Sequence, residues 1–594
     1  MRPDFLMQLF ILNLGVQSIV LFIYLSYYFQ ILLTKYFNKV ENVYDYIIVG
    51  SGTAGSVIAH RLAAETNFTF IVIEAGGKSN SLFEIPVLSP MLHNSVYDWQ
   101  YETVPQENAC LAMNNKKCKL PQGKIVGGSS KINNMVHVRG NISQYAAWFH
   151  GKYDENYLID HFETVERDML HLNEINFESE LVEAMSEAAE QLGYSRLNSD
   201  FKIGYSKSKL SQKNGKRWTI SDSLDLSKYV LSNALVEKVV IRNGVAKGVS
   251  IQIVDKKHNI FAKKGVILSA GTFNTPKILQ LSGIGPANVL KSVNIPIVKN
   301  LPVGYNLQDH VTTGFDLILI NKTLSVNPMS MLDLSNVYEY FVNGKGPLTT
   351  AGCELITFLS TKGDKVPDIQ FMVMPVGISS DRGSHLRLAL GISDTVWENY
   401  FENVFDKHAA TILPIVLHPK SRGEVYIVNT DPKSPPLIDP KYLNCNEDVK
   451  TLINGLKLVE KFLKTPAMKE MGAYINPQHF PNCESHTIFS DAYWDCYVRH
   501  LTLSSYHPVG TCSMGLTSSN SVVDTNFKVF SVANLYVVDA SVLPTLPSGN
   551  INAAVAMMAS VFFDENVKSV KITNTNMYCY KYQLIADLFY KICR

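Results

Sequence analysis

The sequence predicts an α/β fold, and the segment that begins at residue 44 gives the first evidence for it. Residues 44–49 read as a buried strand rich in aromatic and β-branched side chains. A glycine-rich turn follows, then a helix over 56–65 with one apolar side, and then a second buried strand over 68–73. The chain has 594 residues, of which 46% are hydrophobic, so it can bury a large core. This order of elements predicts a β-α-β unit.

The composition excludes several classes of protein. The chain has 54 Lys and Arg against 53 Asp and Glu, a net charge of +1, which argues against a nucleic-acid binder. Only 18% of the residues are charged, which excludes disorder for most of the chain. Nine cysteines are too few for a disulfide scaffold. Cys110 and Cys118 are nevertheless near enough in sequence to close a small loop in an oxidising compartment, with two unrelated thiols as the alternative.

Both ends of the chain have distinctive compositions. Residues 5–34 contain no charged side chain. This uncharged segment is long for a signal peptide, and it is long enough for a membrane-spanning helix. A cleaved signal peptide is favoured over a retained signal-anchor, and a buried helix is the third possibility. Either of the first two directs the chain to the secretory pathway, most simply as a secreted protein, and the acceptor sequences at Asn67, Asn141 and Asn321 agree with glycosylation there. The tail, 571–594, could form an amphipathic helix packed on the body.

The turn at residues 50–55, Gly-Ser-Gly-Thr-Ala-Gly, has the G-x-G-x-x-G pattern in the strand–helix context of a dinucleotide site. The first glycine permits the tight turn, the second lets the backbone approach a pyrophosphate, and the third lets helix and strand pack closely. The helix N-terminus faces the anion with free N–H groups. An acid at the end of the second strand is placed to accept hydrogen bonds from ribose hydroxyls. The predicted contacts are Gly50, Gly52, Thr53, Ala54, Gly55 and Glu74.

Further motifs extend over nearly the whole chain. Residues 121–140 (PQGKIVGGSSKINNMVHVRG) and 270–286 (AGTFNTPKILQLSGIGP) resemble the two signatures of the glucose–methanol–choline (GMC) family of FAD oxidoreductases. Shorter segments at 303–310, 418–423, 507–512 and 537–544 look like other motifs of that family, in the family's order. The resemblance spans about 44–567 and is nearest to the insect branch of glucose dehydrogenases and ecdysone oxidases.

The resemblance implies the cofactor and its contacts. FAD would lie against the Gly-Gly-Ser-Ser loop, whose backbone N–H groups are unhindered. Some relatives attach FAD through a histidine in this segment, but Ile132 stands at the matching position, so the FAD is expected to be non-covalent. A helix N-terminus near residue 552 would support negative charge on a reduced flavin. The further predicted contacts are Gly127, Gly128, Ser129, Asn133, Met135, Val236, Asp539, Ala540 and Asn552.

The resemblance also implies the reaction, in which an alcohol loses a hydride to flavin N5 and a proton to the protein. His507 matches the family's catalytic histidine, and histidine is the usual base near neutral pH. Counting eleven residues on from Asp539 reaches Asn550, an amide that can hold the substrate oxygen but cannot act as a base. Asn552 is the alternative partner if the register slips by two. No metal is expected.

Two interleaved domains follow from the same resemblance. An FAD-binding, Rossmann-like domain would combine 44–150, 225–315 and 505–570. An α+β substrate-binding domain, an antiparallel sheet capped by helices, would combine 151–224 and 316–504.

Three functions remain open at this point. The first is an FAD-dependent oxidoreductase for a sugar or a steroid alcohol, with a quinone or oxygen as the electron acceptor. The second is a flavin-binding member of the family that has lost catalysis and acts as a binding protein. The third, an NAD-dependent dehydrogenase, is opposed by the two long signatures. A membrane would be a partner only if residues 5–34 are retained.

Overall fold

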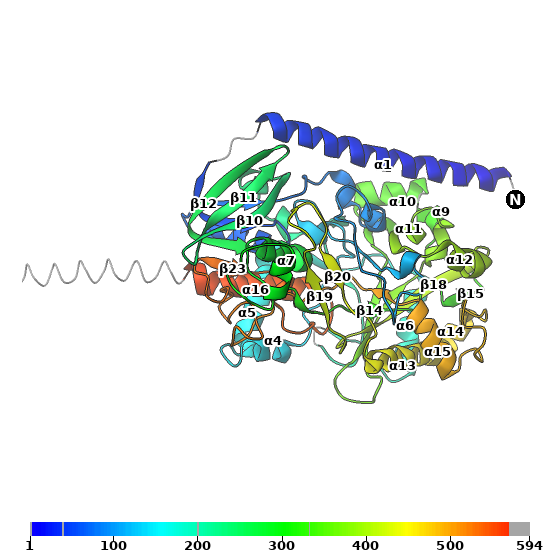
Figure 1. Cartoon of the computed structure of the whole chain (residues 1–594). Coiled ribbons are helices and arrows are strands. Elements are labelled where there is room, and N and C mark those ends of the chain that lie inside the picture. The colour runs from blue at the N-terminus through cyan, green and yellow to red at the C-terminus, as the bar shows by residue number, and fades with distance from the viewer. Residues whose placement is uncertain (1–2, 38–40, 199–200, 323, 332, 569–594) are drawn as a thin grey trace, which may run out of the picture.

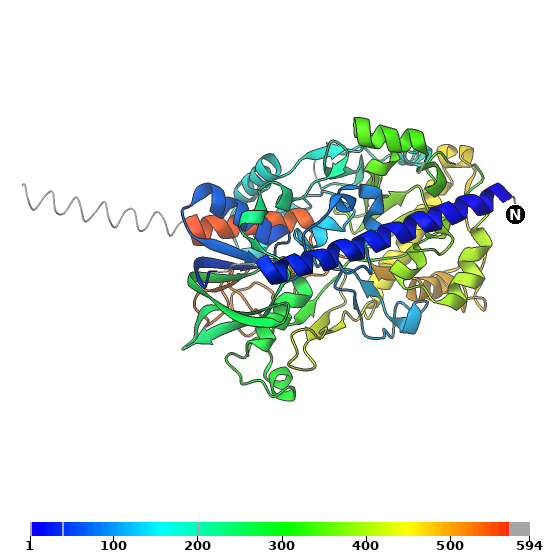
Figure 2. The ribbon, with the colours of Figure 1, turned by 90° about the horizontal axis from the view of Figure 1, so that it is seen from above.

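The computed structural model describes residues 3–37, 41–198, 201–322, 324–331 and 333–568 (Figure 1). The expected tail helix, 571–594, lies outside these residues. The uncharged N-terminal segment forms one long helix, α1 (Pro3–Phe37), which lies along the surface of the body in both views (Figures 1 and 2). Within it, Gln17–Lys35 is long and apolar enough to cross a membrane by length and composition.

The predicted β-α-β unit lies at the centre of the first sheet. β12 (Lys256–Leu268) and β2 (Phe70–Ile73) flank β1 (Val43–Val49) in parallel. On the far side of β12, β11 (Val245–Ile253) pairs antiparallel with β12, and β10 (Ala234–Arg242) pairs antiparallel with β11. Helix α2 (Thr53–Glu65) begins three residues before the predicted helix, directly after the glycine turn. The spatial order is β10 (Ala234–Arg242), β11 (Val245–Ile253), β12 (Lys256–Leu268), β1 (Val43–Val49), β2 (Phe70–Ile73) and β9 (Val230–Leu231), with β23 (Leu535–Val537) also paired to β12.

The second sheet is antiparallel and carries helices, including α13 (Asn446–Leu463) against β17 and β18. Its order is β21 (Ala473–Ile475), β15 (Ile318–Ile320), β18 (His408–Val416), β17 (Ile369–Met374), β16 (Leu355–Leu359) and β6 (Gly204–Lys207), with β14 (Val311–Thr312) and β22 (Leu503–Ser504) paired beside β18. A Rossmann-like sheet joined to an antiparallel α+β region confirms the predicted fold class.

Shorter elements complete the described chain. The remaining helices are α3 (Ser89–Leu92), α4 (Ile142–Trp148), α5 (Glu155–Met169), α6 (Glu180–Gln191), α7 (Gly271–Leu281), α8 (Ala287–Ser292), α9 (Pro328–Met331), α10 (Leu334–Tyr338), α11 (Leu386–Leu390), α12 (Asp394–Val396), α14 (Pro466–Glu470), α15 (Asp491–His500) and α16 (Asn552–Phe563). The remaining strands are β3 (Tyr101–Glu102), β4 (Lys119–Leu120), β5 (Leu172–Glu174), β7 (Lys209–Lys213), β8 (Lys216–Arg217), β13 (Tyr305–Leu307), β19 (Gly423–Tyr426) and β20 (Leu437–Asp439).

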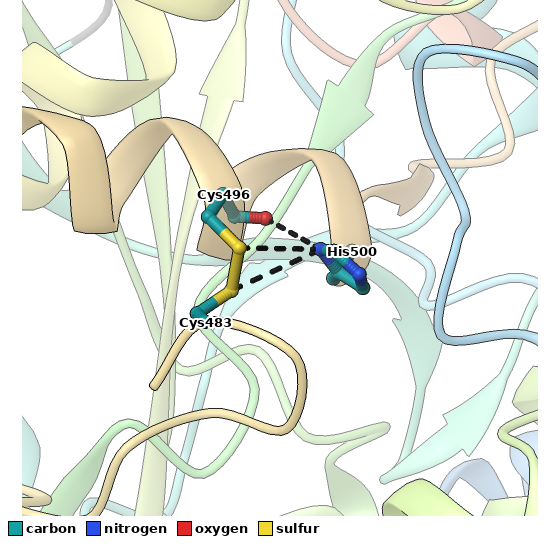
Figure 3. A group of neighbouring side chains, drawn as sticks. All are labelled: Cys483, Cys496 and His500. Atoms are coloured by element: carbon teal, nitrogen blue, oxygen red, sulfur yellow. Dashed lines mark hydrogen bonds between the residues drawn. A yellow bond between two sulfur atoms is a disulfide. The ribbon is translucent and has the colours of Figure 1, made fainter. Parts of the chain in front are cut away.

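Within the described residues, the disulfide is not the one that the sequence spacing allowed. Cys110 and Cys118 are buried free thiols, and Cys118 Sγ accepts a hydrogen bond from the backbone N–H of Ser504 at 3.3 Å. Proximity in sequence allowed the loop to close, but it did not decide which sulfurs meet. Cys483 and Cys496 are bonded instead, and they join a loop to α15 beside His500 (Figure 3). These three residues are grouped closely enough to hold a metal, but the disulfide leaves no thiolate for one.

Replacing Cys496 by Ser is expected to lower the free energy of unfolding by about 3 kcal/mol, because the bridge closes a loop across a sequence separation of 13 residues. Chemical denaturation of the oxidised protein measures this change. Cys445→Ser is the matched control, because that half-buried thiol is free, and its effect should stay within about 0.5 kcal/mol. Equal stability of the two variants would show that the bridge does not stabilise the fold.

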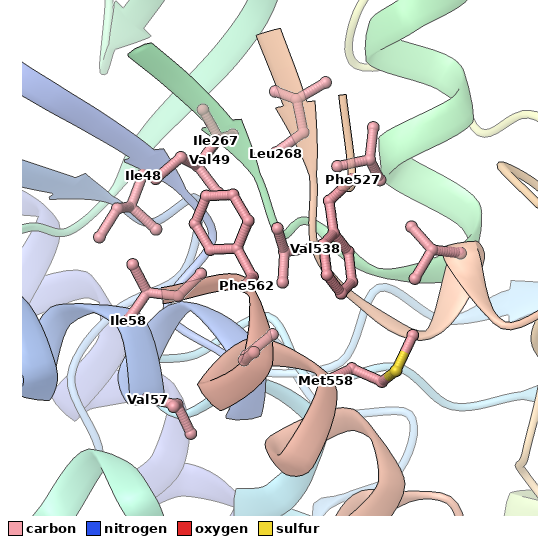
Figure 4. Close-up of a cluster of buried hydrophobic side chains, with 14 of the residues drawn as sticks. Ile48, Val49, Val57, Ile58, Ile267, Leu268, Phe527, Val538, Met558 and Phe562 are labelled. Carbon is pink, nitrogen blue, oxygen red and sulfur yellow. The ribbon is translucent and has the colours of Figure 1, made fainter. Parts of the chain in front are cut away.

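The first core packs α2 and α16 against the parallel strands. Phe562 and Met558 of α16 belong to one buried cluster with Ile48, Val49 and Ile267 of the sheet (Figure 4). Helix α5 joins the same core through Leu158, Phe162, Val165 and Met169, and it packs on α16. The sequence analysis assigned α5 to the substrate-binding domain; from this packing we propose that the domain boundary falls after α5.

Candidate active site

A cavity of about 370 Å³ is lined by residues of both sheets. On one side lie the glycine turn before α2, the 121–136 segment and the N-terminal end of α16. On the other side lie side chains of β17, β18 and α11. His507 and Asn550 line the same cavity, so the predicted cofactor contacts and the predicted catalytic pair share one space.

Most of the predicted cofactor contacts line this cavity, and two lie behind its wall. A Cβ at Gly55 would stand 2.0 Å from the carbonyl oxygen of Gly50, so helix and turn pack too closely for any side chain there. Gly127 has a φ of 100° and donates its N–H to the backbone oxygen of Ser51, which places it in the turn beneath the cavity. The cavity-lining members of the predicted set are Gly50, Gly52, Thr53, Ala54, Glu74, Gly128, Ser129, Asn133, Met135, Val236, Asp539, Ala540 and Asn552.

The structure fits a dinucleotide at this wall. Gly52 and Gly128 face each other so closely that a Cβ at Gly128 would stand 2.9 Å from Gly52 Cα, which leaves backbone rather than side chains at the surface. Helices α2 and α16 both begin at the cavity, and neither first turn is capped by a side chain at its N-cap residue. Their N–H groups and positive dipole ends suit a pyrophosphate and a negatively charged flavin.

Glu74 lies at the end of β2 and is buried. Its Oε2 accepts hydrogen bonds from the N–H and the hydroxyl of Ser51, and its Oε1 accepts one from the N–H of Gly76. Burial raises the pKa of this carboxyl, and the three donors oppose the rise. The contacts fix the carboxylate at the wall, where it can also accept from a ribose.

Arg217 supports the Asn133 segment from behind, a role that the sequence analysis did not foresee. Its guanidinium donates to Asn133 Oδ1 at 2.8 Å, to the Asn133 carbonyl at 2.6 Å and to the Ser130 carbonyl at 2.9 Å. Burial lowers the pKa of Arg217 to about 9. The chain thus holds a buried cation beneath the loop that lines the cavity. The sequence signal was an Arg in a segment that matches the family only loosely.

His507 and Asn550 are in contact. Asn550 Nδ2 lies 3.2 Å from His507 Nε2, and Asn550 Oδ1 accepts from Gln370 Nε2 at 3.4 Å. Because Gln370 occupies the amide oxygen, the amide NH₂ is directed at the imidazole. Asn552 Oδ1 instead accepts a hydrogen bond from the hydroxyl of Thr53, so this side chain is engaged at the start of α2.

A second histidine fixes the tautomer of the first. His310 Nε2 lies 3.1 Å from the carbonyl oxygen of Leu417, and since a carbonyl only accepts, Nε2 carries a hydrogen. Burial holds the pKa of His310 well below its usual value, so the ring is neutral and its Nδ1 has a lone pair. His507 Nδ1 lies 3.0 Å from that lone pair and therefore donates to it. The Nε2 of neutral His507 is left unprotonated at the cavity.

Burial also sets the charge and the position of His507. It lowers the pKa of His507 to about 4, so the imidazole is a free base at neutral pH. The backbone N–H of His507 donates to Asp309 Oδ1 at 2.9 Å, and Asp309 Oδ2 accepts from the hydroxyls of Ser504 and Tyr442. Asp309 therefore anchors the segment that carries the base. The Asp-His pair at 309–310, in a segment that resembles a family motif, could have indicated that Asp309 supports the base. Nothing in the sequence near Gln370 indicated that it contacts Asn550.

The wall opposite the glycine turn is apolar. Charged side chains among the described lining residues are Glu74, Lys277 and Asp539, and none of them comes from the second sheet. The apolar lining side chains from β17, β18, α11 and the neighbouring loops are Phe315, Ala351, Met372, Met374, Ile378, Leu386, Ala389, Leu390 and Leu413. Two polar side chains of the same sheet, Thr312 of β14 and Ser504 of β22, also line the cavity.

Comparisons with known proteins find related sequences and a related fold. Two models described as GMC oxidoreductase match residues 44–312 and 419–559. Glucose dehydrogenase [FAD, quinone] of Drosophila pseudoobscura pseudoobscura is 31% identical, over 89% of this chain and 87% of its own. Ecdysone oxidase of Bombyx mori is 30% identical, over 90% of this chain and 83% of its own. The crystal structure of pyridoxine 4-oxidase from Mesorbium loti superposes with a TM-score of 0.72 at 25% identity, over 87% of this chain and 98% of that one.

Proposed function

Since this chain belongs to the GMC oxidoreductase family and is an FAD-dependent alcohol oxidoreductase, we propose that His507 is its catalytic base and Asn550 the residue that orients the substrate oxygen. The observation that carries the assignment is the unprotonated Nε2 of His507, which is held at the cavity beside the Asn550 amide. The base takes the hydroxyl proton, and Asn550 donates a hydrogen bond to the oxygen that is left. Bound FAD supplies the hydride acceptor at its N5.

The FAD is held without a covalent bond in this proposal. Ile132, which lines the cavity, has no nucleophile, and the glycine turn, Glu74 and the start of α16 supply the non-covalent contacts. Denaturing the protein in acid tests this assignment, because the flavin colour should move entirely into the soluble fraction. Colour that stays with the precipitated chain would mean covalent attachment.

The substrate is an apolar alcohol such as a steroid, rather than a sugar. A sugar brings several hydroxyls, each of which needs a partner when it leaves water. The wall built by β17, β18 and α11 carries apolar side chains such as Met372, Leu386 and Leu413, which cannot form hydrogen bonds with these hydroxyls. A rigid apolar alcohol gains from contact with the same wall. Among the relatives, one is named for glucose and another for ecdysone, and the lining favours the second kind of substrate.

Anaerobic mixing with candidate alcohols is expected to reduce the flavin with a second-order rate constant roughly 10²-fold or more higher for a steroid alcohol than for glucose. Stopped-flow absorbance of the flavin measures both rates. A preference for glucose would overturn the substrate assignment alone. A flavin that dithionite reduces but no alcohol does would instead favour the second candidate, a binding protein without catalysis. Re-oxidation by air compared with a soluble quinone then identifies the acceptor.

A further inference from the structure

We propose that α1 is retained in the mature protein and lies flat in the surface of a lipid bilayer, which makes the enzyme a monotopic membrane protein. The proposal does not depend on the substrate. It rests on two observations: α1 is docked on the body through specific contacts of Ile23, Gln30 and Thr34, and large apolar side chains on its outer side are exposed.

The side of α1 that faces the body makes specific contacts, and Gln30 and Thr34 are paired there. Gln30 donates to the Lys78 carbonyl at 2.9 Å and accepts from the Lys78 N–H at 2.6 Å, so both ends of its amide are paired. Thr34 Oγ1 accepts from Asn233 Nδ2 at 3.0 Å. Ile23 is 1% exposed and packs in a cluster with Phe83, Leu92, Tyr97, Ile125 and Ile132.

The body is shaped to receive this side. A Cβ on Gly77 would stand 2.6 Å from Gln30 Oε1, so the glycine leaves the space in which the amide sits. Tyr97 contacts α1 twice: its hydroxyl lies 3.4 Å from Gln30 Nε2, and its ring packs edge-on against Tyr27. The residues that make these contacts lie in the 77–97 segment, and they form a specific docking site for α1 on the folded enzyme.

Between Leu21 and Leu32 the opposite side of α1 is apolar and uncovered, whereas Gln17 and Ser18 are exposed nearer the N-terminus. Leu21, Leu25, Tyr28, Phe29 and Leu32 are 59, 60, 61, 61 and 52% exposed. This stripe extends for about 17 Å along the helix, at 1.5 Å per residue. Residues 5–34 contain no charge that would solvate it. Such a surface is stable when its surroundings are apolar.

The position of α1 selects a bilayer surface over a membrane span. The helix lies along the body over its described length (Figures 1 and 2), so one of its sides is already occupied by protein. If α1 crossed the bilayer while it stayed docked on the body, the polar protein surface beside it would enter the hydrocarbon. The exposed backbone groups of that surface would then lose their hydrogen bonds to water. Lying in the interface buries the outer stripe and leaves the docked side intact.

Flotation of the full-length protein with phosphatidylcholine vesicles tests the proposal. The wild-type chain is expected to float, with or without anionic lipid, because the outer stripe is uncharged. The combined variant Leu21→Ser, Leu25→Ser, Phe29→Ser, Leu32→Ser should lose at least about tenfold in vesicle binding while it keeps its flavin absorbance. The matched control, Gln30→Leu, changes the inner side and should still float. Wild-type binding by the combined variant would overturn the proposal.

Two further measurements separate a helix that lies in the membrane surface from a span or a cleaved signal. A cysteine introduced as Asp4→Cys in a Cys445→Ser background should react with an impermeant maleimide added outside sealed vesicles, because both ends of a lying helix are on one side. Protection from the reagent until the vesicles are lysed would show a span. A mature N-terminus beyond residue 37 in protein made through the secretory pathway would show cleavage. Either result would overturn the proposal.

Discussion

Replacing His507 by Ala is expected to leave FAD bound and to slow flavin reduction by an alcohol roughly 10²- to 10⁴-fold, the range for the loss of a general base. The variant lacks the unprotonated Nε2 that the His310 contact directs at the cavity. Stopped-flow reduction under anaerobic conditions measures the loss. A rate equal to that of the wild type would overturn the assignment of the base.

The pH dependence follows from the lowered pKa of His507. Burial disfavours the charged ring, so the competent neutral form predominates above about pH 4 and is lost as the pH falls through that value. The reduction rate of the wild type should therefore rise with pH near 4 and be flat at neutral pH, and His507→Ala should lack this rise. His93→Ala is the matched control, since His93 is a half-buried histidine that also lines the cavity and has a pKa lowered to about 4, but its ring contacts the Ile132 carbonyl instead of Asn550. The His93→Ala variant should keep most of the wild-type rate of flavin reduction.

Replacing His310 by Phe is expected to lower the reduction rate on the order of 10⁴-fold, the loss seen when a catalytic histidine is left in the wrong tautomer. The phenyl ring fills the space but cannot accept the hydrogen of His507 Nδ1. His507 is then free to carry its hydrogen on Nε2, where it cannot take a proton. His310 acts through His507, so it is a positioning residue.

The conservative variant distinguishes positioning from packing. His310→Gln offers an amide oxygen to His507 Nδ1 and an amide NH₂ to the Leu417 carbonyl, so it should recover a large part of the lost rate. Nitrogen NMR of His507 should report hydrogen on Nδ1 in the wild type and in the Gln variant, and a mixture in the Phe variant. Equal rates and equal tautomers for Phe and wild type would contradict the argument.

The first sheet could be predicted from local pattern because its signals are close in sequence. The strand at 44–49, the glycine turn and the second strand lie within 30 residues, and each has its own periodicity. The helix was predicted to begin at 56 but begins at Thr53, because the turn passes directly into the helix. The second sheet could be predicted only through the family resemblance. Its strands run from β6 to β22 along the chain, and long connections separate most strands that are neighbours in the sheet.

The site residues that could not be predicted from the sequence are those that reach the site through long-range contacts. His507 and Asn550 could be named from motifs, but Gln370 meets Asn550 from 180 residues away and His310 meets His507 from 197. No local pattern encodes such partners. The same limit applies to Cys110 and Cys118, whose spacing allowed either a disulfide or two unrelated thiols, and which are two free thiols. Spacing shows that a loop can close, but it does not show which sulfurs are directed at each other.

The surface on which α1 docks shares Ile132 with the lining of the cavity. Ile132 packs in the cluster that holds Ile23 of α1, and it also lines the cavity. An enzyme that rests on a bilayer beside this wall would draw an apolar alcohol from lipid rather than from water. Its saturation would then follow the mole fraction of substrate in the membrane, so added inert phospholipid should act as a diluent and raise the apparent KM at constant total substrate.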